Sequence, residues 1–337
     1  MKLLVSFLIA LGAIVLLFWW GGIEFGDVWG AVRGINPWIF GLVLVIQATI
    51  HLFRGLRLRG LIHSMGEAPP PIRGLASSSA AWILDSQVLP GRIGEATLVL
   101  HLKRVGVDPE HGVVGLLLSR LLDLFTLSSV LCLSSLILGL MGGRANAPYL
   151  LPLGAAMLGV SLFLAISIFQ GGTFVGWGRG LLRRLGFARL IVGAKALSFG
   201  GKVEDALHSV PRAALYRAAG WSLCVTAAII AAYIVLGTGV GLPELTPLEF
   251  FFGASFAILG SLLPISGFLG IGAFDMAWAF GFAAMGVPQE TAVATGFAFH
   301  ALYLVSIAFH GAWGHALLSS TVASMRAKPE IESKTAP

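Results

Sequence analysis

Long apolar stretches dominate the chain and predict helices that cross a membrane. A helix needs about 20 apolar residues to span a bilayer, and six stretches come close to that length. They are residues 3–20, 37–52, 112–141, 149–169, 215–236 and 292–318. The first could also be a signal peptide, but its long apolar core favours a membrane anchor. The pattern predicts an all-α polytopic membrane protein with six transmembrane spans.

Two further apolar regions are interrupted in the middle. Residues 75–102 are cut by Pro90 and Gly91, and residues 250–285 are cut by Pro264 and Gly267. We expect each to form a re-entrant hairpin of two broken helices, with a pair of short crossing helices as the alternative. Broken helices at matching places in two halves of a chain are typical of a transport site.

The order of these elements repeats along the chain. Residues 1–142 are expected to form span, span, hairpin and span, and residues 149–320 repeat that order. Three crossings per half would insert the second half upside down, so the pattern predicts an inverted repeat within one membrane domain, residues 1–337. The alternative is that any six-span protein divides into halves by chance.

Positive charges predict the orientation. The chain has 22 Lys and Arg residues, and such residues concentrate in short cytoplasmic loops. With the N-terminus inside, only Arg33 and Arg144 fall in outer loops, and Arg54 and Arg57 count as cytoplasmic loop residues. We therefore expect both termini, including the tail at residues 325–337, on the cytoplasmic side of the inner (cytoplasmic) membrane.

A basic segment at residues 172–211 is expected to lie on the cytoplasmic surface. Its Arg and Lys residues alternate with Leu, Phe and Ile, as in an interfacial helix. The net charge of +6 indicates this topology and attraction to anionic phospholipids. It does not indicate a nucleic-acid partner.

The first interrupted region carries the motif PGRIGE at residues 90–95. A helix that starts at Pro90 would present free backbone N–H groups, with Gly91 and Gly94 permitting a close approach, to a phosphate. Arg92 would add a bidentate donor, and Glu95 would lie on the same helix face. In the alternative reading, Arg92 extends to the lipid head groups and merely pairs with Glu95.

The second interrupted region ends in the motif GIGAFD, with Gly270, Gly272 and Asp275. These glycines and this acid complete the predicted substrate-binding set. Asp275 has no Lys or Arg nearby in sequence, so it could be protonated and inert, or it could exchange a proton or cation. His300 in the last span is expected to donate an interhelical hydrogen bond, with a proton relay as the alternative.

Arg120 and Asp123 stand three residues apart in the third span. Intramembrane charges need partners or a function. We expect an ion pair, internal or interhelical, that fixes packing, and direct substrate contact is the alternative. Arg120 could also neutralise Glu95 and so tie the first hairpin to the bundle.

No sequence pattern indicates a metal, a cofactor or an enzyme. His310 and His315 are five residues apart and lie on different helix faces, so a helical zinc pair is not expected. P-loop, GxSxG and HExxH motifs are missing from the sequence.

PGRIGE, the following Lys103-Arg104-Val105-Gly106, SRLLD at residues 119–123 and GIGAFD at residues 270–275 resemble the lysylphosphatidylglycerol synthase transmembrane-region family. The resemblance covers nearly the whole chain. It implies a flippase-like domain that moves an anionic or lipid-linked phospholipid between leaflets.

The chain departs from the usual family pattern at Ser86, Gln87, Leu98, Ser119 and Asp275, which leaves the head group of the substrate open. A similar single-domain subgroup is associated with hopanoid biosynthesis, so a terpenoid lipid is the alternative substrate. The leading hypothesis is a lipid flippase or carrier with a phosphate-bearing lipid substrate. The alternatives are a membrane-embedded accessory subunit or enzyme of lipid, hopanoid or cell-envelope glycan synthesis, and a scaffold that assembles a synthase.

Overall fold

The structure is a computed structural model that describes residues 25–89, 93–141, 149–184, 191–242, 244–262 and 272–335. All regular secondary structure in these ranges is helical, as the sequence predicts. The helices are α2 (Phe25–Arg33), α3 (Pro37–Ser64), α4 (Ile72–Val88), α5 (Ile93–Arg104), α6 (Pro109–Met141), α7 (Leu150–Phe169), α8 (Gly171–Arg184), α9 (Ile191–Ser209), α10 (Arg212–Gly239), α11 (Pro247–Leu262), α12 (Ala273–Ala283) and α13 (Gln289–Thr335).

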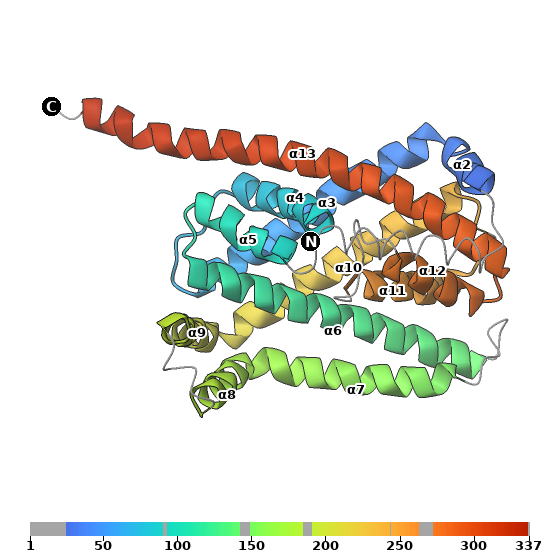
Figure 1. Ribbon diagram of the computed structural model, residues 1–337, viewed down its shortest axis with the longest axis horizontal. Coiled ribbons are helices and arrows are strands. Elements are labelled where there is room, and N and C mark those ends of the chain that lie inside the picture. Colours follow the sequence, from blue (N-terminus) through green and yellow to red (C-terminus); the bar gives the residue numbers. More distant parts are fainter. Residues whose placement is uncertain are drawn as a thin grey trace.

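Five helices are long and apolar enough to cross a membrane: α3, α6, α7, α10 and α13. They match five of the six predicted spans and confirm a multi-pass membrane protein. The predicted span at residues 3–20 lies outside the described residues. Figure 1 shows these helices running side by side along the long axis of the molecule.

α3 is longer than its predicted span. The sequence prediction ended it at Leu52, where charged residues begin, but the helix continues to Ser64. Helix continuation is possible because Arg57, beyond that point, is buried and paired with other helices. Arg54 and Arg57 are therefore residues of a helix inside the bundle, and counting them among the loop charges was wrong.

Each interrupted region forms two short helices that pack against each other, α4 with α5 and α11 with α12. α4 ends at Val88, two residues before Pro90, and α11 ends at Leu262, two residues before Pro264. The two pairs lie toward opposite ends of the long helices (Figure 1). Their lengths of about 25 Å or less are shorter than a bilayer's hydrocarbon core.

Glycines allow these helices to approach closely. A Cβ atom on Gly94 would lie 2.5 Å from the Cα of Ser86, and one on Gly260 would lie 2.6 Å from the carbonyl oxygen of Ala273. Glycine is therefore required for helix contact within both pairs.

α13 crosses the molecule and packs along α4. A Cβ atom on Gly314 would lie 2.6 Å from the backbone nitrogen of Ala81, and one on Gly311 would lie 2.2 Å from the Cβ of Leu84. This contact fixes the first helical pair against the last long helix. α8 and α9 lie at the same end of the bundle as the C-terminal part of α13, whereas α2 lies at the opposite end (Figure 1).

The apolar core has two large parts. One surrounds α4, α5 and α6 and includes Leu75, Leu102 and Leu118. The other surrounds α10, α12 and α13 and is rich in aromatic rings, such as Trp278 and Phe299, whose centroids lie 4.3 Å apart. Polar side chains between these parts form the candidate site.

Candidate functional site

A polar stripe on α3 runs through the centre of the bundle. We use this name for Gln47, His51, Arg54 and Arg57, which recur at intervals of three or four residues and so lie on one helix face. Gln47 donates to the hydroxyl of Ser306 on α13 at 3.0 Å, and the ring of His51 lies 3.3 Å from the hydroxyl of Ser79 on α4. The stripe thus links α3 to α13 and α4.

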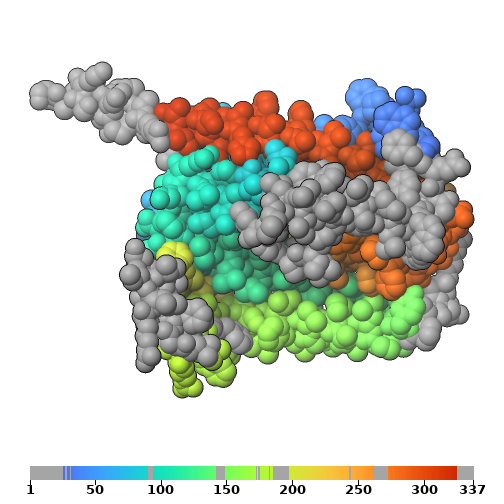
Figure 2. Space-filling model, viewed as in Figure 1, coloured from blue at the N-terminus to red at the C-terminus, as the bar shows by residue number. Residues whose placement is uncertain are grey.

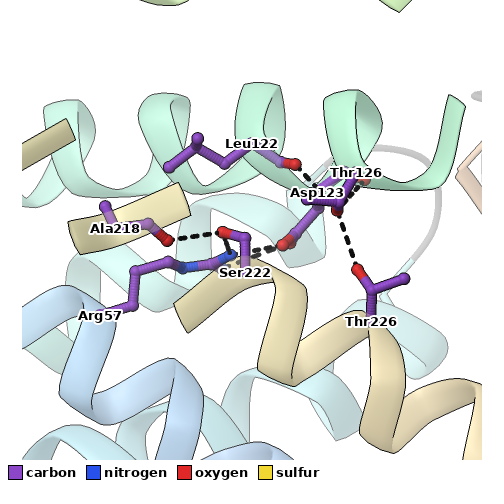
Figure 3. Close-up of polar contacts among 7 residues, drawn as sticks. All are labelled: Arg57, Leu122, Asp123, Thr126, Ala218, Ser222 and Thr226. Atoms are coloured by element: carbon purple, nitrogen blue, oxygen red, sulfur yellow. Dashed lines mark hydrogen bonds and ion pairs between the residues drawn. The ribbon is translucent and has the colours of Figure 1, made fainter. Parts of the chain in front are cut away.

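Arg57 forms a buried ion pair with Asp123 on α6. Its Nη1 also donates to the hydroxyl of Ser222 on α10 at 2.7 Å, and its Nη2 lies 3.3 Å from Asp123 Oδ2. Figure 3 shows the guanidinium of Arg57 between Asp123 and Ser222, which come from two other helices. Only 3 % of the Arg57 side chain is exposed, so this contact joins three long helices in the interior.

Arg120 forms a second ion pair, with Glu95 on α5. Its Nε donates to Glu95 Oε2 at 2.9 Å, and its guanidinium lies 4.5 Å from the ring centroid of Trp82. The alternative contact between Arg120 and Glu95 suggested by the sequence is therefore present. Each of these two α6 residues pairs with a residue of another helix: Arg120 with Glu95 on α5, and Asp123 with Arg57 on α3. The interhelical form of the predicted ion pairing is therefore the one present.

A small pocket lies between these ion pairs. It is lined by Arg54, Arg57, Leu58, Ser79, Trp82, Leu98, Leu116, Ser119 and Arg120. Its volume is about 10 Å³, which is room for about one water molecule. A group larger than a water molecule could enter only if the surrounding helices separated.

Several hydrogen-bond donors at this pocket have no partner among the described residues. They are Nε of Arg54, Nε of Arg57, Nε1 of Trp82 and the hydroxyl of Ser119. The guanidinium of Arg54 lies 5.6 Å from the ring centroid of Trp82. Unpaired buried donors are costly unless a ligand or water satisfies them.

The described charges around the pocket do not balance. Arg54, Arg57 and Arg120 contribute three positive charges, whereas Asp123 and Glu95 contribute two negative charges. A singly negative ligand would neutralise the excess. We call these five residues with Trp82 and Ser119 the arginine pocket.

Asp275 lies in the other half of the molecule and is 1 % exposed. Its Oδ2 accepts the backbone N–H of Gly272 at 3.0 Å, and its Oδ1 lies 2.9 Å from Nδ1 of His300 on α13. Gly272 has a φ of +100°, a conformation that favours glycine. His300 therefore makes the interhelical contact that the sequence predicted, and Asp275 caps the start of α12.

The two acidic motifs have equivalent partners. Glu95 lies in the first turn of α5 and pairs with Arg120, 25 residues later on α6. Asp275 lies in the first turn of α12 and contacts His300, 25 residues later on α13. In each half of the chain, the acid at the start of the second short helix is joined to the next long helix.

The structure does not describe every predicted site residue. Gly91, Arg92 and Gly270 lie outside the described residues. Gly94, Glu95, Gly272 and Asp275 are described, and the two glycines allow a close helix contact and a helix cap, respectively. Glu95 and Asp275 lie in different helical pairs, so the described motifs do not form one cluster.

The sequence analysis missed Arg54 and Arg57 as pocket residues because they follow the most apolar part of α3. Their spacing from Gln47 and His51 was the available signal, since four polar residues on one face of an apolar helix indicate a polar interface. No feature of the sequence indicated that Asp123 would select Arg57.

Within the described part of the chain, two other groups have metal-ligand chemistry. One contains Asp85, His101 and His315, and the other contains Glu67, Asp108 and His111. Neither group contributes to the arginine pocket. His310, which was not expected to form a zinc pair with His315, contacts the carbonyl oxygen of Ser306.

Comparison with curated proteins gave no match. The model of one protein family, described as the lysylphosphatidylglycerol synthase TM region, matches residues 3–311. This match covers the helices that carry both ion pairs, both helical pairs and Asp275. The chain therefore belongs to the lysylphosphatidylglycerol synthase transmembrane-region family, as the sequence motifs suggested.

Proposed function

We propose that the chain is a carrier that moves a lipid with an anionic, phosphate-bearing head group between membrane leaflets. The observation that carries this proposal is the arginine pocket, which combines one excess guanidinium with unpaired buried donors. A phosphate oxygen accepts hydrogen bonds from such donors and neutralises the charge. A water molecule would satisfy the unpaired donors of the pocket, but it would leave the excess positive charge without a counter-charge.

The same chemistry favours one of the substrate alternatives. A neutral polycyclic terpenoid has no anionic acceptor for Arg54, whereas a phosphodiester has two unesterified oxygens. Guanidinium groups bind phosphate in a bidentate way. The ring of Trp82, which lies beside Arg54 and Arg120, holds both guanidinium groups near the pocket. We therefore favour a phospholipid or another lipid phosphate.

Alternating access by two inverted halves is the proposed mode of transport. The equal spacing of the Glu95–Arg120 and Asp275–His300 contacts supports it. The packing also has counterparts: α13 packs on α4 as α6 packs on α11, and α3 packs on α10 at the centre. The short helical pairs would then be re-entrant hairpins on opposite faces of the membrane.

The proposed setting is the inner membrane with both termini cytoplasmic. α8 supports a surface position because Trp177 and Leu181 are exposed beside Arg183 and Arg184 in its last turn. Such a helix would bury its apolar residues at the lipid interface and attract anionic head groups. We propose a carrier without a chemical step, so no residue is assigned to catalysis.

The test is leaflet-resolved translocation of fluorescent phosphatidylglycerol in proteoliposomes. Arg54→Gln removes the excess charge and should lower the initial rate about tenfold or more, since charge-assisted hydrogen bonds contribute about 1.5–3 kcal/mol. Arg54→Lys keeps the charge and should retain part of the rate. Arg59→Gln is the matched control, because Arg59 is exposed on the same helix.

Folding is checked separately by size-exclusion chromatography and helical circular dichroism. If the unaltered protein translocates lipid no faster than protein-free vesicles, the carrier proposal fails and the accessory-subunit or enzyme alternative is favoured. If Arg54→Gln transports at the unaltered rate, the arginine pocket is not the head-group site.

A further inference from the structure

The geometry points to a transition-metal site formed by Asp85, His101 and His315, which would bind one Zn²⁺ ion and join α4, α5 and α13. These residues lie on three different helices. The Nε2 atom of His101 lies 2.8 Å from Asp85 Oδ2, and the Nε2 atom of His315 lies 3.1 Å from Asp85 Oδ1. Nothing in the family match assigns a metal to this cluster.

The side chains present a donor set that zinc prefers. Two imidazole nitrogens and one carboxylate, with water in the fourth position, form a common tetrahedral arrangement. The three ligand atoms lie within 4.8 Å of one another. In a tetrahedral site with bonds of about 2.0–2.1 Å, ligand atoms lie about 3.3 Å apart, so small side-chain rotations would admit the ion.

The charge of Asp85 is a second observation that points to a cation. Glu95 and Asp123 each pair with a guanidinium, whereas the ion-pair partners of Asp85 among the described residues are the two imidazoles. One proton on one imidazole would neutralise the carboxylate. Two rings direct Nε2 at the two oxygens of the same carboxylate, so the cluster brings two imidazole nitrogens and one carboxylate to one place.

The surroundings of the cluster allow an ion to enter and be held. The side chain of His101 is 5 % exposed, and that of His315 is 40 % exposed. The two rings are perpendicular, with centroids 5.3 Å apart. Figure 2 shows the cyan surface of the first helical pair in contact with the red surface of α13, so the metal would lie at a contact between elements that is accessible from one side.

The other candidate group provides an internal control. Oε1 of Glu67 already accepts the backbone N–H of Asp108 at 2.8 Å, and its Oε2 lies 2.7 Å from Nδ1 of His111. The Glu67 carboxylate already stabilises the turn before α6, and its group contains one imidazole, whereas the Asp85 group contains two. We therefore assign the metal to the Asp85 group.

The experiment measures metal binding to the full chain, purified in detergent and stripped with chelator. Isothermal titration with Zn²⁺ should give one tight site per chain, and Co²⁺ should give the intense visible absorption of a tetrahedral site. His101→Gln and His315→Gln should each weaken affinity about tenfold or more and abolish the Co²⁺ band, because each removes one ligand. His111→Gln should bind like the unaltered protein.

Thermal unfolding is the second readout. Zn²⁺ should raise the melting temperature of the unaltered protein and of His111→Gln, since a ligand that binds only the folded state stabilises it. His315 is partly exposed, so His315→Gln should fold and show no such rise.

The inference is overturned by any of three results: no micromolar Zn²⁺ binding to the unaltered protein, no tetrahedral Co²⁺ band, or loss of both in His111→Gln alone. Imidazole protonation without metal binding would assign the cluster to proton chemistry instead. Lipid translocation is not measured in this experiment, so its outcome is independent of the carrier proposal.

Discussion

The Nδ1 atom of His300 lies 2.9 Å from the Oδ1 atom of Asp275, and the two residues are 25 positions apart in the chain. Both side chains are buried, and the other oxygen of Asp275 accepts the N–H of Gly272. One carboxylate thus fixes the start of α12 and attaches that helix to α13. Loss of the carboxylate should therefore affect two contacts separately.

Substitution of Asp275 should reveal these two contacts. Asp275→Asn keeps an acceptor for Gly272 but weakens the contact with His300, so we expect a loss of about 1–3 kcal/mol in the free energy of unfolding. Asp275→Ala also removes the helix cap and should cost about 1 kcal/mol more. Unfolding in detergent measures both, with Glu244→Gln, at an exposed loop position between α10 and α11, as control. Equal stability of the Asn and Ala variants would show that the cap contributes nothing.

The Arg57–Asp123 pair should be costly to break from either side. Arg57→Met or Asp123→Leu alone leaves a buried charge without its ion-pair partner, which costs about 3–5 kcal/mol, whereas the double substitution should recover part of that loss. Thermal unfolding of the three variants gives the coupling energy. The control is Glu110→Gln, whose partner Lys202 is 62 % exposed, and a loss below about 1 kcal/mol is expected there. Additive losses in the double variant would contradict the pairing.

The contact between α4 and α13 should not tolerate a side chain at Gly314. Gly314→Ala would place its Cβ 2.6 Å from the backbone nitrogen of Ala81, so the helices must separate and the melting temperature should fall. Gly220→Ala on α10 is the control because its Cβ would meet nothing within 4 Å. Alanine has the higher helix propensity, so the control should gain up to about 1 kcal/mol. A gain at both positions would show that close packing is not required.

The proposed orientation is testable by cysteine labelling of intact cells. Cys132 and Cys224 are first replaced by Ala, since Cys224 is exposed. A cysteine at Lys195 should then be protected from an impermeant maleimide, and one at Glu244 should react, because positive residues concentrate inside. Labelling after cell lysis shows that both sites are reactive. Reaction at position 195 in intact cells would reverse the topology and remove support for the inverted repeat.

Much of the fold could be predicted from local sequence properties. Apolar length identified the five described spans, and the Pro and Gly residues marked where α4 and α11 end. These features depend on the bilayer and on the backbone of neighbouring residues, so they are readable without long-range contacts.

The partners of the buried charges could not be predicted in the same way. Arg57 and Asp123 are 66 residues apart, and Arg57 also reaches Ser222. Which acid meets which base depends on how three long helices cross, and apolar length does not specify that crossing. The Arg120–Glu95 contact was predicted only as an alternative. Arg54 and Arg57 were predicted to be loop residues because the predicted span ended at Leu52, whereas α3 continues to Ser64.

The serines of α4 affect how this helix can move. Ser77 and Ser78 donate their hydroxyls to carbonyl oxygens of their own helix, at Arg73 and Gly74. Translation of α4 along α13 would leave these hydrogen bonds intact, because they travel with the helix. The polar contacts that must break during such a motion lie near the ends of α4. They join Arg73 to Ser320 and Asp85 to His315. The rate of a sliding motion should therefore depend on these two polar contacts together with the close packing at Gly311 and Gly314, and not on the serine hydroxyls.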